Sequence, residues 1–224
     1  MDPNSQRHPL TRYIDHAVLS PAAGRDELIS ACELAARRNV RCLCVRPCDV
    51  ADAAEQLKNF PEVAVGTVIG FPHGTTTTEA KVAEVRRAVA DGADELDMVL
   101  NVARLRDGRL DDVRRDMATV VAAAEERLVK VILECGYLDR PQMAAACRAA
   151  QEAGCHFVKT STGFGPCGAR VEDVRFLRSC VGDALGVKAA GGIRTADNAR
   201  AMIDAGATRI GTSSTEAILT QSEA

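Results

Sequence analysis

The sequence has no tryptophan, and its 224 residues include only 2 tyrosines and 5 phenylalanines. A core with so few aromatic rings must be filled by small and branched aliphatic side chains, which suits helices packed closely on a parallel sheet. Long apolar runs are also missing, since no stretch reaches the roughly 18 apolar residues of a membrane span. The N-terminal residues contain no apolar signal core. We therefore expect a cytoplasmic protein without a membrane partner.

Neither sign of charge dominates the sequence. The 28 lysines and arginines nearly balance 31 aspartates and glutamates, and the formal net charge is −3. Because there is no basic run, nucleic acid is not an expected partner. Apolar residues make up 46% of the chain and charged residues 26%, which is typical of a folded globular protein and excludes a disordered one.

The sequence also lacks the usual patterns of a disulfide framework or a metal centre. Its nine cysteines are an odd number, which argues against a disulfide framework in a protein that is not secreted. The one cluster, Cys42, Cys44 and Cys48, lacks the C-x2-C pairs of zinc sites. The four histidines show no H-x-x-x-H or H-x-E spacing. We therefore expect no metal and no other cofactor, and interpret the cysteines as buried or incidental thiols.

Eight short apolar runs alternate with segments of helical periodicity. Successive runs start 23 to 35 residues apart, the length of a strand followed by a crossover helix. Thr195 is a typical helix N-cap, and Gly92, Gly154 and Gly206 are typical helix ends. The predicted strands are 12–16, 40–45, 63–69, 94–99, 129–134, 156–160, 185–189 and 209–212.

This alternation predicts a single (β/α)8 TIM barrel domain over residues 1–224, because no linker separates the eight units. A doubly wound open sheet would have fewer strands and a G-x-G-x-x-G after its first strand, which is absent. We expect residues 1–10 and 220–224 to be flexible. In a TIM barrel, the chemistry lies at the carboxyl ends of the strands and in the loops that follow them.

Two lysines are predicted at matched positions of adjacent strands. Lys159 is placed at the carboxyl end of the sixth strand and Lys188 at that of the seventh, and neighbouring strand axes lie about 4.8 Å apart. Two ammonium groups so close inside a barrel should lower the pKa of one of them, and a neutral amine can attack a carbonyl carbon to form a Schiff base. The alternative is that both lysines extend outward to solvent, as most lysines do.

Other charged residues on the predicted strands can assist such an amine. Asp97 lies in an apolar run where an ionised acid needs a partner, so we expect it to pair with a lysine and relay protons through water. The alternative is an outward Asp97 at a helix N-cap. Lys130 competes for the role of nucleophile, but we interpret it as part of a charge network because it is placed near a strand start. Asp15 and His16 are placed at the end of the first strand, where both are expected to contact the substrate.

Glycine and serine residues follow the last predicted strands. Backbone N–H groups of such loops, with a helix N-terminus behind them, bind phosphate, and this is the usual phosphate site of the fold. We therefore expect a phosphorylated small-molecule substrate. Arg194 either adds a positive charge at this site or only caps its helix. The expected substrate-binding residues are Thr162 and Gly163 after the sixth strand, Gly191 and Gly192 after the seventh, and Ser213 and Ser214 after the eighth.

Six segments carry motifs that are specific in combination: Ile14-Asp-His16, Thr67-Val-Ile-Gly-Phe-Pro72, Glu95-Leu-Asp-Met98, Val129-Lys-Val-Ile-Leu-Glu134, Phe157-Val-Lys-Thr-Ser-Thr-Gly163 and Val187-Lys-Ala-Ala-Gly-Gly-Ile-Arg194. They resemble the 2-deoxyribose-5-phosphate aldolase family, from about residue 11 to residue 219. The resemblance implies a metal-free class I aldolase, a lyase that reversibly cleaves 2-deoxy-D-ribose 5-phosphate to D-glyceraldehyde 3-phosphate and acetaldehyde. It implies that Lys159 forms the Schiff base, that Lys188 lowers its pKa, and that Asp97 transfers protons.

Two other functions remain open at this point. Another Schiff-base sugar-phosphate aldolase, or a transaldolase-like barrel, would share the lysines and the phosphate loops. A non-catalytic phosphosugar-binding regulator would keep the loops but would not need both Lys159 and Lys188. Cys44 matches a cysteine near the active site of some members of the family. We also expect the protein to be a homodimer.

Overall fold

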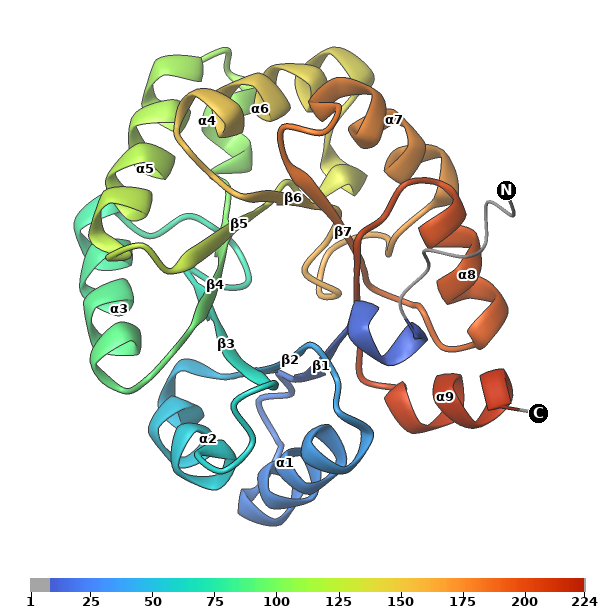
Figure 1. Cartoon of the computed structure of the whole chain (residues 1–224). Coiled ribbons are helices and arrows are strands. Elements are labelled where there is room, and N and C mark those ends of the chain that lie inside the picture. The colour runs from blue at the N-terminus through green and yellow to red at the C-terminus, as the bar shows by residue number, and fades with distance from the viewer. Residues whose placement is uncertain (1–8, 224) are drawn as a thin grey trace.

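The computed structural model describes residues 9–223, which form a closed barrel of parallel strands inside a ring of helices (Figure 1). Each strand pairs with the next in the sequence, and the eighth pairs with the first. The predicted (β/α)8 fold is therefore confirmed. The strands are β1 (Ile14–Val18), β2 (Cys42–Val45), β3 (Ala64–Ile69), β4 (Glu95–Val99), β5 (Leu128–Ile132), β6 (Phe157–Lys159), β7 (Gly186–Ala190) and β8 (Arg209–Thr212).

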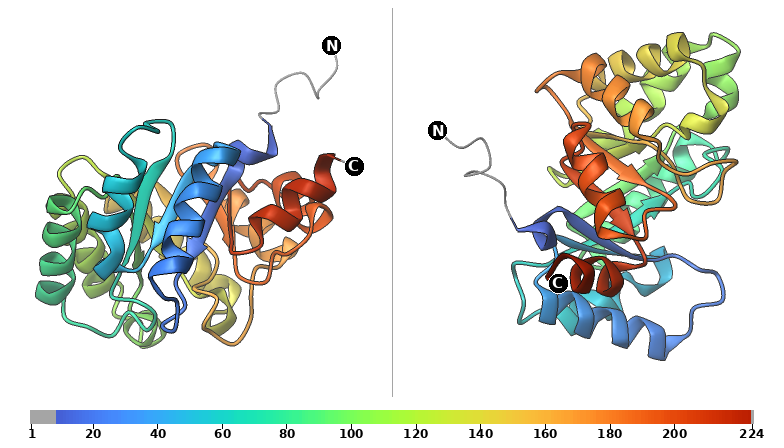
Figure 2. Two further views of the ribbon diagram at one scale, coloured as in Figure 1. Left: turned by 90° about the horizontal axis from the view of Figure 1, so that it is seen from below. Right: turned by 90° about the vertical axis from the view of Figure 1, so that its right-hand side faces the viewer.

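The helices cover the outer face of the barrel, as the two side views also show (Figure 2). The described part of the chain also contains three short 3-10 helices: η1 (Leu10–Tyr13), η2 (Pro47–Asp49) and η3 (Cys135–Tyr137). The α-helices are α1 (Arg25–Arg38), α2 (Val50–Leu57), α3 (Thr78–Ala90), α4 (Val102–Arg106), α5 (Leu110–Ala123), α6 (Arg140–Glu152), α7 (Val171–Val181), α8 (Ala196–Asp204) and α9 (Thr215–Glu223).

The helices begin and end at the residues that the sequence indicates. The Thr195 hydroxyl accepts a hydrogen bond from the N–H of Asn198 at 3.2 Å and caps α8. Gly206 follows the same helix with φ of 109°, a left-handed conformation that a side chain would strain. Gly92 and Gly154 end α3 and α6 in the same way.

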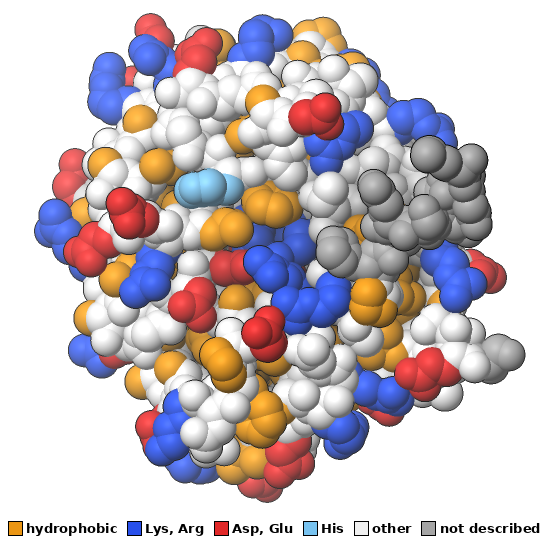
Figure 3. All heavy atoms as spheres, in the orientation of Figure 1, with side chains coloured by type: hydrophobic (Ala, Val, Ile, Leu, Met, Phe, Trp, Pro, Cys, Tyr) orange, Lys and Arg blue, Asp and Glu red, His pale blue; other side chains and the backbone are white. Residues whose placement is uncertain are grey.

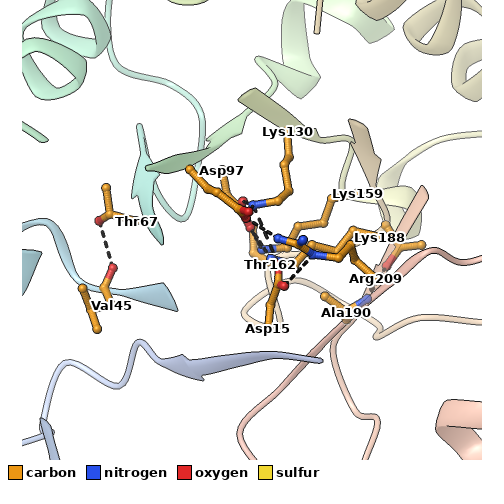
Figure 4. Close-up of polar contacts among 12 residues, drawn as sticks. Asp15, Val45, Thr67, Asp97, Lys130, Lys159, Thr162, Lys188, Ala190 and Arg209 are labelled. Atoms are coloured by element: carbon orange, nitrogen blue, oxygen red, sulfur yellow. Dashed lines mark hydrogen bonds and ion pairs between the residues drawn. The ribbon is translucent and has the colours of Figure 1, made fainter. Parts of the chain in front are cut away.

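The aliphatic core lies between the strands and the helices, outside the barrel. In β5, Val129 and Val131 belong to this core, whereas Lys130 points into the barrel, because side chains of a strand alternate between its faces (Figure 4). The charged side chains that point into the barrel form the site described below.

Some strands are displaced from their predicted positions. The predicted strand 12–16 begins too early, because η1 extends to Tyr13 and β1 starts at Ile14, so Asp15 lies in its first half. Lys188 and Lys130 each occupy the middle of their strands, whereas Lys159 is the last residue of β6. Apolar content alone does not mark where pairing starts and stops, so errors of this size are expected.

The chain ends were expected to be flexible over residues 1–10 and 220–224. Residues 1–8 and 224 lie outside the described residues. Leu10 begins η1, and residues 220–223 form the end of α9.

The outer surface carries both signs of charge. On the face shown in Figure 3, acidic and basic side chains alternate around the rim with small groups of hydrophobic ones. Within residues 9–223, no helix has both the length and the apolar character needed to cross a membrane.

Candidate active site

Seven charged side chains from six strands meet inside the barrel (Figure 4). All are buried, with at most 4% of any residue exposed. Strand register brings them together, since Lys159 lies directly opposite Lys188, and Asp97 opposite Lys130. We call this group the barrel charge cluster: Asp15, Glu95, Asp97, Lys130, Lys159, Lys188 and Arg209.

Asp97 is the centre of the barrel charge cluster. One of its oxygens, Oδ2, lies 2.7 Å from the Nζ atoms of both Lys159 and Lys188, and Oδ1 lies 2.7 Å from Nζ of Lys130. Burial raises the pKa of Asp97, but the three lysines outweigh burial and hold its pKa well below the usual value. Asp97 is therefore an ionised carboxylate inside the barrel and does not face outward.

The two neighbouring lysines differ in their carboxylate partners. Lys188 contacts Asp15 at 2.5 Å in addition to Asp97. Burial lowers the pKa of Lys188, but the two carboxylates outweigh burial and raise it above the usual value. Within residues 9–223, Asp97 is the only carboxylate that contacts Lys159. Burial lowers the pKa of Lys159, and the charge of Lys188 lowers it further despite Asp97. Lys159 is thus the amine that loses its proton more easily.

The balance of charge in the cluster leads to the same conclusion. Arg209 pairs with Asp15 at 2.7 Å and with Glu95, and Lys130 contacts Glu95 at 2.7 Å. Fully ionised, the cluster holds four cations and three carboxylates. A neutral Lys159 leaves three of each, and an uncompensated buried charge is strongly destabilising.

A cavity of about 750 Å³ opens beside the two lysines. Lys159 and Lys188 both line it, as do Cys44, His16 and Arg194. Of the residues expected to bind substrate, those that line this cavity are Thr162, Gly163, Gly191, Gly192 and Ser213. Asp15 and Ser214 are not among its lining residues.

Asp15 has a different position from the one expected. It is fully buried beneath the cavity, and its oxygens pair with Lys188 and Arg209. Burial raises its pKa, but these cations outweigh burial and lower it to about 2. The structure therefore brings Asp15 to the lysines and not to the cavity wall.

His16 and Cys44 are both uncharged at neutral pH. Burial lowers the pKa of His16 to about 4, and its Nδ1 lies 2.8 Å from the hydroxyl of Thr215. Burial likewise raises the pKa of the Cys44 thiol. Of the two lysines beside the cavity, Lys188 thus supplies the positive charge.

Three charged residues that sequence reasoning did not assign to the site belong to it or adjoin it. Glu95 precedes Asp97 by two residues and so shares its face of β4, a signal that could have been used. Arg209 is the first residue of β8, and it lies beside Asp15 only because β8 pairs with β1 and closes the barrel. Glu134 was placed on the fifth strand, but β5 ends at Ile132 and Glu134 lies in the following loop.

Within residues 9–223, one group of three side chains could hold a metal ion: Asp15, Cys42 and Glu95, whose ligand atoms lie within 4.8 Å of one another. Arg209 already pairs with both carboxylates. Burial raises the pKa of the Cys42 thiol well above its usual value, so it stays protonated. A donor set in this state does not fit a cation.

Lys58 differs from the other four of the chain's five lysines. Its side chain is 58% exposed, and it follows the last residue of α2. The remaining four are buried: Lys81, Lys130, Lys159 and Lys188.

Residues 10–220 match the model of the DeoC/LacD family aldolases. The chain belongs to the DeoC/LacD aldolase family. The match spans the whole barrel, so the fold and the barrel charge cluster both lie within the family domain.

Relatives within the DeoC/LacD family are similar over most of their length. The deoxyribose-phosphate aldolase of Thermococcus gammatolerans is 52% identical over 208 residues, which cover 92% of each chain. That of an Exiguobacterium species is 49% identical over 211 residues, covering 94% of this chain and 96% of the relative.

Solved structures of the family have the same backbone. A structure described as a putative deoxyribose-phosphate aldolase from Coccidioides immitis superposes with a TM-score of 0.94 at 38% identity, covering 96% of this chain and 86% of that one. The tetrameric deoxyribose phosphate aldolase from Aeropyrum pernix gives a TM-score of 0.90 at 31% identity, with coverage of 96% and 91%.

Proposed function

We propose that this DeoC/LacD aldolase reversibly cleaves 2-deoxy-D-ribose 5-phosphate to D-glyceraldehyde 3-phosphate and acetaldehyde. The observation that carries the proposal is the buried amine of Lys159, which lines the cavity and whose pKa is lowered by burial and by Lys188. The substrate is inferred from relatives named deoxyribose-phosphate aldolase.

The reaction begins with attack on the sugar. The neutral Nζ of Lys159 attacks the aldehyde carbon of the open-chain sugar to give a carbinolamine. A proton delivered from water to the carbinolamine hydroxyl lets it leave as water, and a protonated imine remains. Lys188 stays charged because it is paired with Asp15 and Asp97. This fixed positive charge keeps Lys159 neutral before attack.

Cleavage then uses the imine as an electron sink. Removal of the proton from the 3-hydroxyl lets the bond between C2 and C3 break, and its electrons move into the imine to give an enamine. D-Glyceraldehyde 3-phosphate leaves. Protonation of the enamine carbon and hydrolysis then release acetaldehyde and free Lys159. Asp97, 2.7 Å from Nζ of Lys159, is placed to relay these protons through water.

A direct assay separates this function from the alternatives. Release of acetaldehyde from 2-deoxy-D-ribose 5-phosphate can be followed by its reduction with NADH and alcohol dehydrogenase. Rapid release supports the proposal. Turnover of ketose phosphates alone would indicate another Schiff-base aldolase, and binding without turnover would indicate a phosphosugar-binding regulator.

We predict that the loops after β7 and β8 determine affinity for the phosphate. Gly192 and Ser213 line the cavity, so a carboxylate in Ser213→Asp would repel the phosphate group. The KM for 2-deoxyribose 5-phosphate should rise at least tenfold, whereas turnover of unphosphorylated deoxyribose should change much less. Equal losses on both substrates would show that the loop serves folding only.

We also predict that chelation leaves turnover unchanged. A mechanism that uses an imine as electron sink requires no Lewis acid, and the donor set of Asp15, Cys42 and Glu95 does not fit a cation. Turnover should be the same before and after prolonged dialysis against EDTA. A loss that a divalent metal restores would contradict the assignment of Lys159.

We propose that the protein is cytoplasmic and forms a homodimer. All nine cysteines are unpaired, which supports a reducing compartment such as the cytoplasm. The expected homodimer can be tested by light scattering on the purified protein; the Aeropyrum pernix aldolase is described as tetrameric.

A further inference from the structure

Glu134 is a buried carboxylate that the mechanism above does not use. It lies two residues beyond β5 with a left-handed backbone, at φ of 54°, and only 3% of it is exposed. Its Oε2 atom accepts hydrogen bonds from the N–H of Thr162 at 3.2 Å and from the Thr162 hydroxyl. Oε1 has no hydrogen-bond partner anywhere in residues 9–223. Within that part of the chain, Thr162 is the only residue that Glu134 contacts through side-chain hydrogen bonds.

Hydrogen-bond counting then restricts what Thr162 can offer a substrate. A threonine hydroxyl has one proton to donate and two lone pairs that accept. Its proton is donated to Glu134, and one lone pair accepts from the N–H of Phe164 at 3.0 Å. Thr162 lines the cavity beside Lys159. The hydroxyl therefore has only one lone pair left for a further contact, which accepts from a hydroxyl and repels a carbonyl oxygen.

Gly165 leaves the space that this arrangement needs. A Cβ atom at Gly165 would lie 2.5 Å from the carboxyl carbon of Glu134, closer than non-bonded atoms can approach. Gly165 does not have a positive φ, so its backbone would tolerate alanine. Substitution there would act by displacing the Glu134 carboxylate.

We propose that Glu134 is a positioning residue that holds the Thr162 hydroxyl as a hydrogen-bond acceptor, and so selects substrates with a hydroxyl group at that point. The proposal rests on the aldolase function above and deepens it. It predicts discrimination between acceptor aldehydes, because acetaldehyde itself has no hydroxyl and its imine with Lys159 needs no help from Thr162.

The test runs the reaction toward synthesis, with acetaldehyde as donor and two acceptors. One acceptor is D-glyceraldehyde 3-phosphate, and the other is 3-oxopropyl phosphate, the same aldehyde without its hydroxyl. Glu134→Ala and Gly165→Ala should each reduce the preference in kcat/KM for the hydroxylated acceptor by about three- to tenfold, the effect of one hydrogen bond. Glu134→Gln, which keeps an acceptor oxygen, should retain most of the preference. Adding Gly165→Ala to Glu134→Ala should cause no further loss.

Borohydride trapping of the acetaldehyde imine distinguishes positioning from folding. Trapping on Lys159 should proceed in Glu134→Ala and Gly165→Ala as in the unmodified protein. Glu152→Ala, which replaces an exposed glutamate, is the control and should change neither the trapping nor the acceptor preference. An acceptor preference that does not change in the alanine variants would overturn the role of Glu134. A loss of trapping that accompanies the loss of preference would overturn it as well. If Glu134→Ala does not fold, Gly165→Ala gives the same answer. Failure of trapping in the unmodified protein would instead contradict the proposed function.

Discussion

Acetaldehyde and sodium borohydride, added together at neutral pH, should place one ethyl group on Lys159 and leave the other three buried lysines, Lys81, Lys130 and Lys188, unmodified. Lys159 combines access to the cavity with a lowered pKa. Lys130 and Lys188 are held as ammonium ions by two or more carboxylates each. Lys81 is buried against Asp116 at 2.5 Å. Peptide mass spectrometry would identify the modified residue.

The matching substitution, Lys159→Ala, should abolish both the adduct and turnover. Loss of a covalent nucleophile reduces kcat by several orders of magnitude in enzymes that depend on one. Lys58→Ala is the control, because it removes the exposed lysine of α2 and should leave turnover unchanged. An adduct on Lys188 or Lys130 in the unmodified protein would overturn the assignment.

Lys188→Leu should move imine formation to more alkaline pH. In this variant, one of the three lysines that contact Asp97 is missing. Asp97 still stabilises the ammonium form of Lys159, but the positive charge of Lys188 that destabilised this form is gone. The pKa of Lys159 then rises toward its unperturbed value of about 10.4. For each unit of rise, the neutral fraction at pH 7 falls about tenfold. The initial rate of borohydride trapping, measured from pH 6 to pH 10, reports this shift.

Folding must be checked in this variant, because Asp15 loses its contact with Lys188. Removing one partner of a buried ion pair destabilises a protein by about 3–5 kcal/mol. Lys188→Arg is the matched control, since it keeps the positive charge and should keep the trapping profile near that of the unmodified protein. Thermal unfolding followed by circular dichroism shows the range in which each variant is folded. An unchanged pH profile in folded Lys188→Leu would contradict the role of Lys188.

The fold was predictable because it depends on a repeating pattern. Eight apolar runs at nearly regular spacing, with helix caps such as Thr195 between them, leave few alternatives to a barrel. Strand ends were less predictable. The predicted strand 12–16 missed the start of β1, because the residues of η1 are compatible with either structure. Pairing with β2 and β8 decides where β1 begins.

The site was predictable where it follows from position on a strand. Lys159 and Asp97 could be assigned to the site because each lies on a predicted strand, and strands of a barrel direct alternate side chains toward the barrel axis. The pairing of Asp15 with Arg209 could not be predicted, since the two residues meet only after the eighth strand closes on the first. The contact of Glu134 with Thr162 could not be predicted for a different reason. It depends on the left-handed backbone of Glu134, and strand periodicity does not indicate such a turn.

The single exposed lysine has a practical consequence. Lys58 follows α2, which runs back along the barrel before β3, so it lies near the amino ends of the strands and away from the cavity. Amine-reactive linkers should therefore couple the side chain of Lys58 to a solid support, because the other lysine side chains are enclosed. Beads prepared through Lys58 would present the open end of every barrel to the flowing solution, an orientation suited to a continuous reactor.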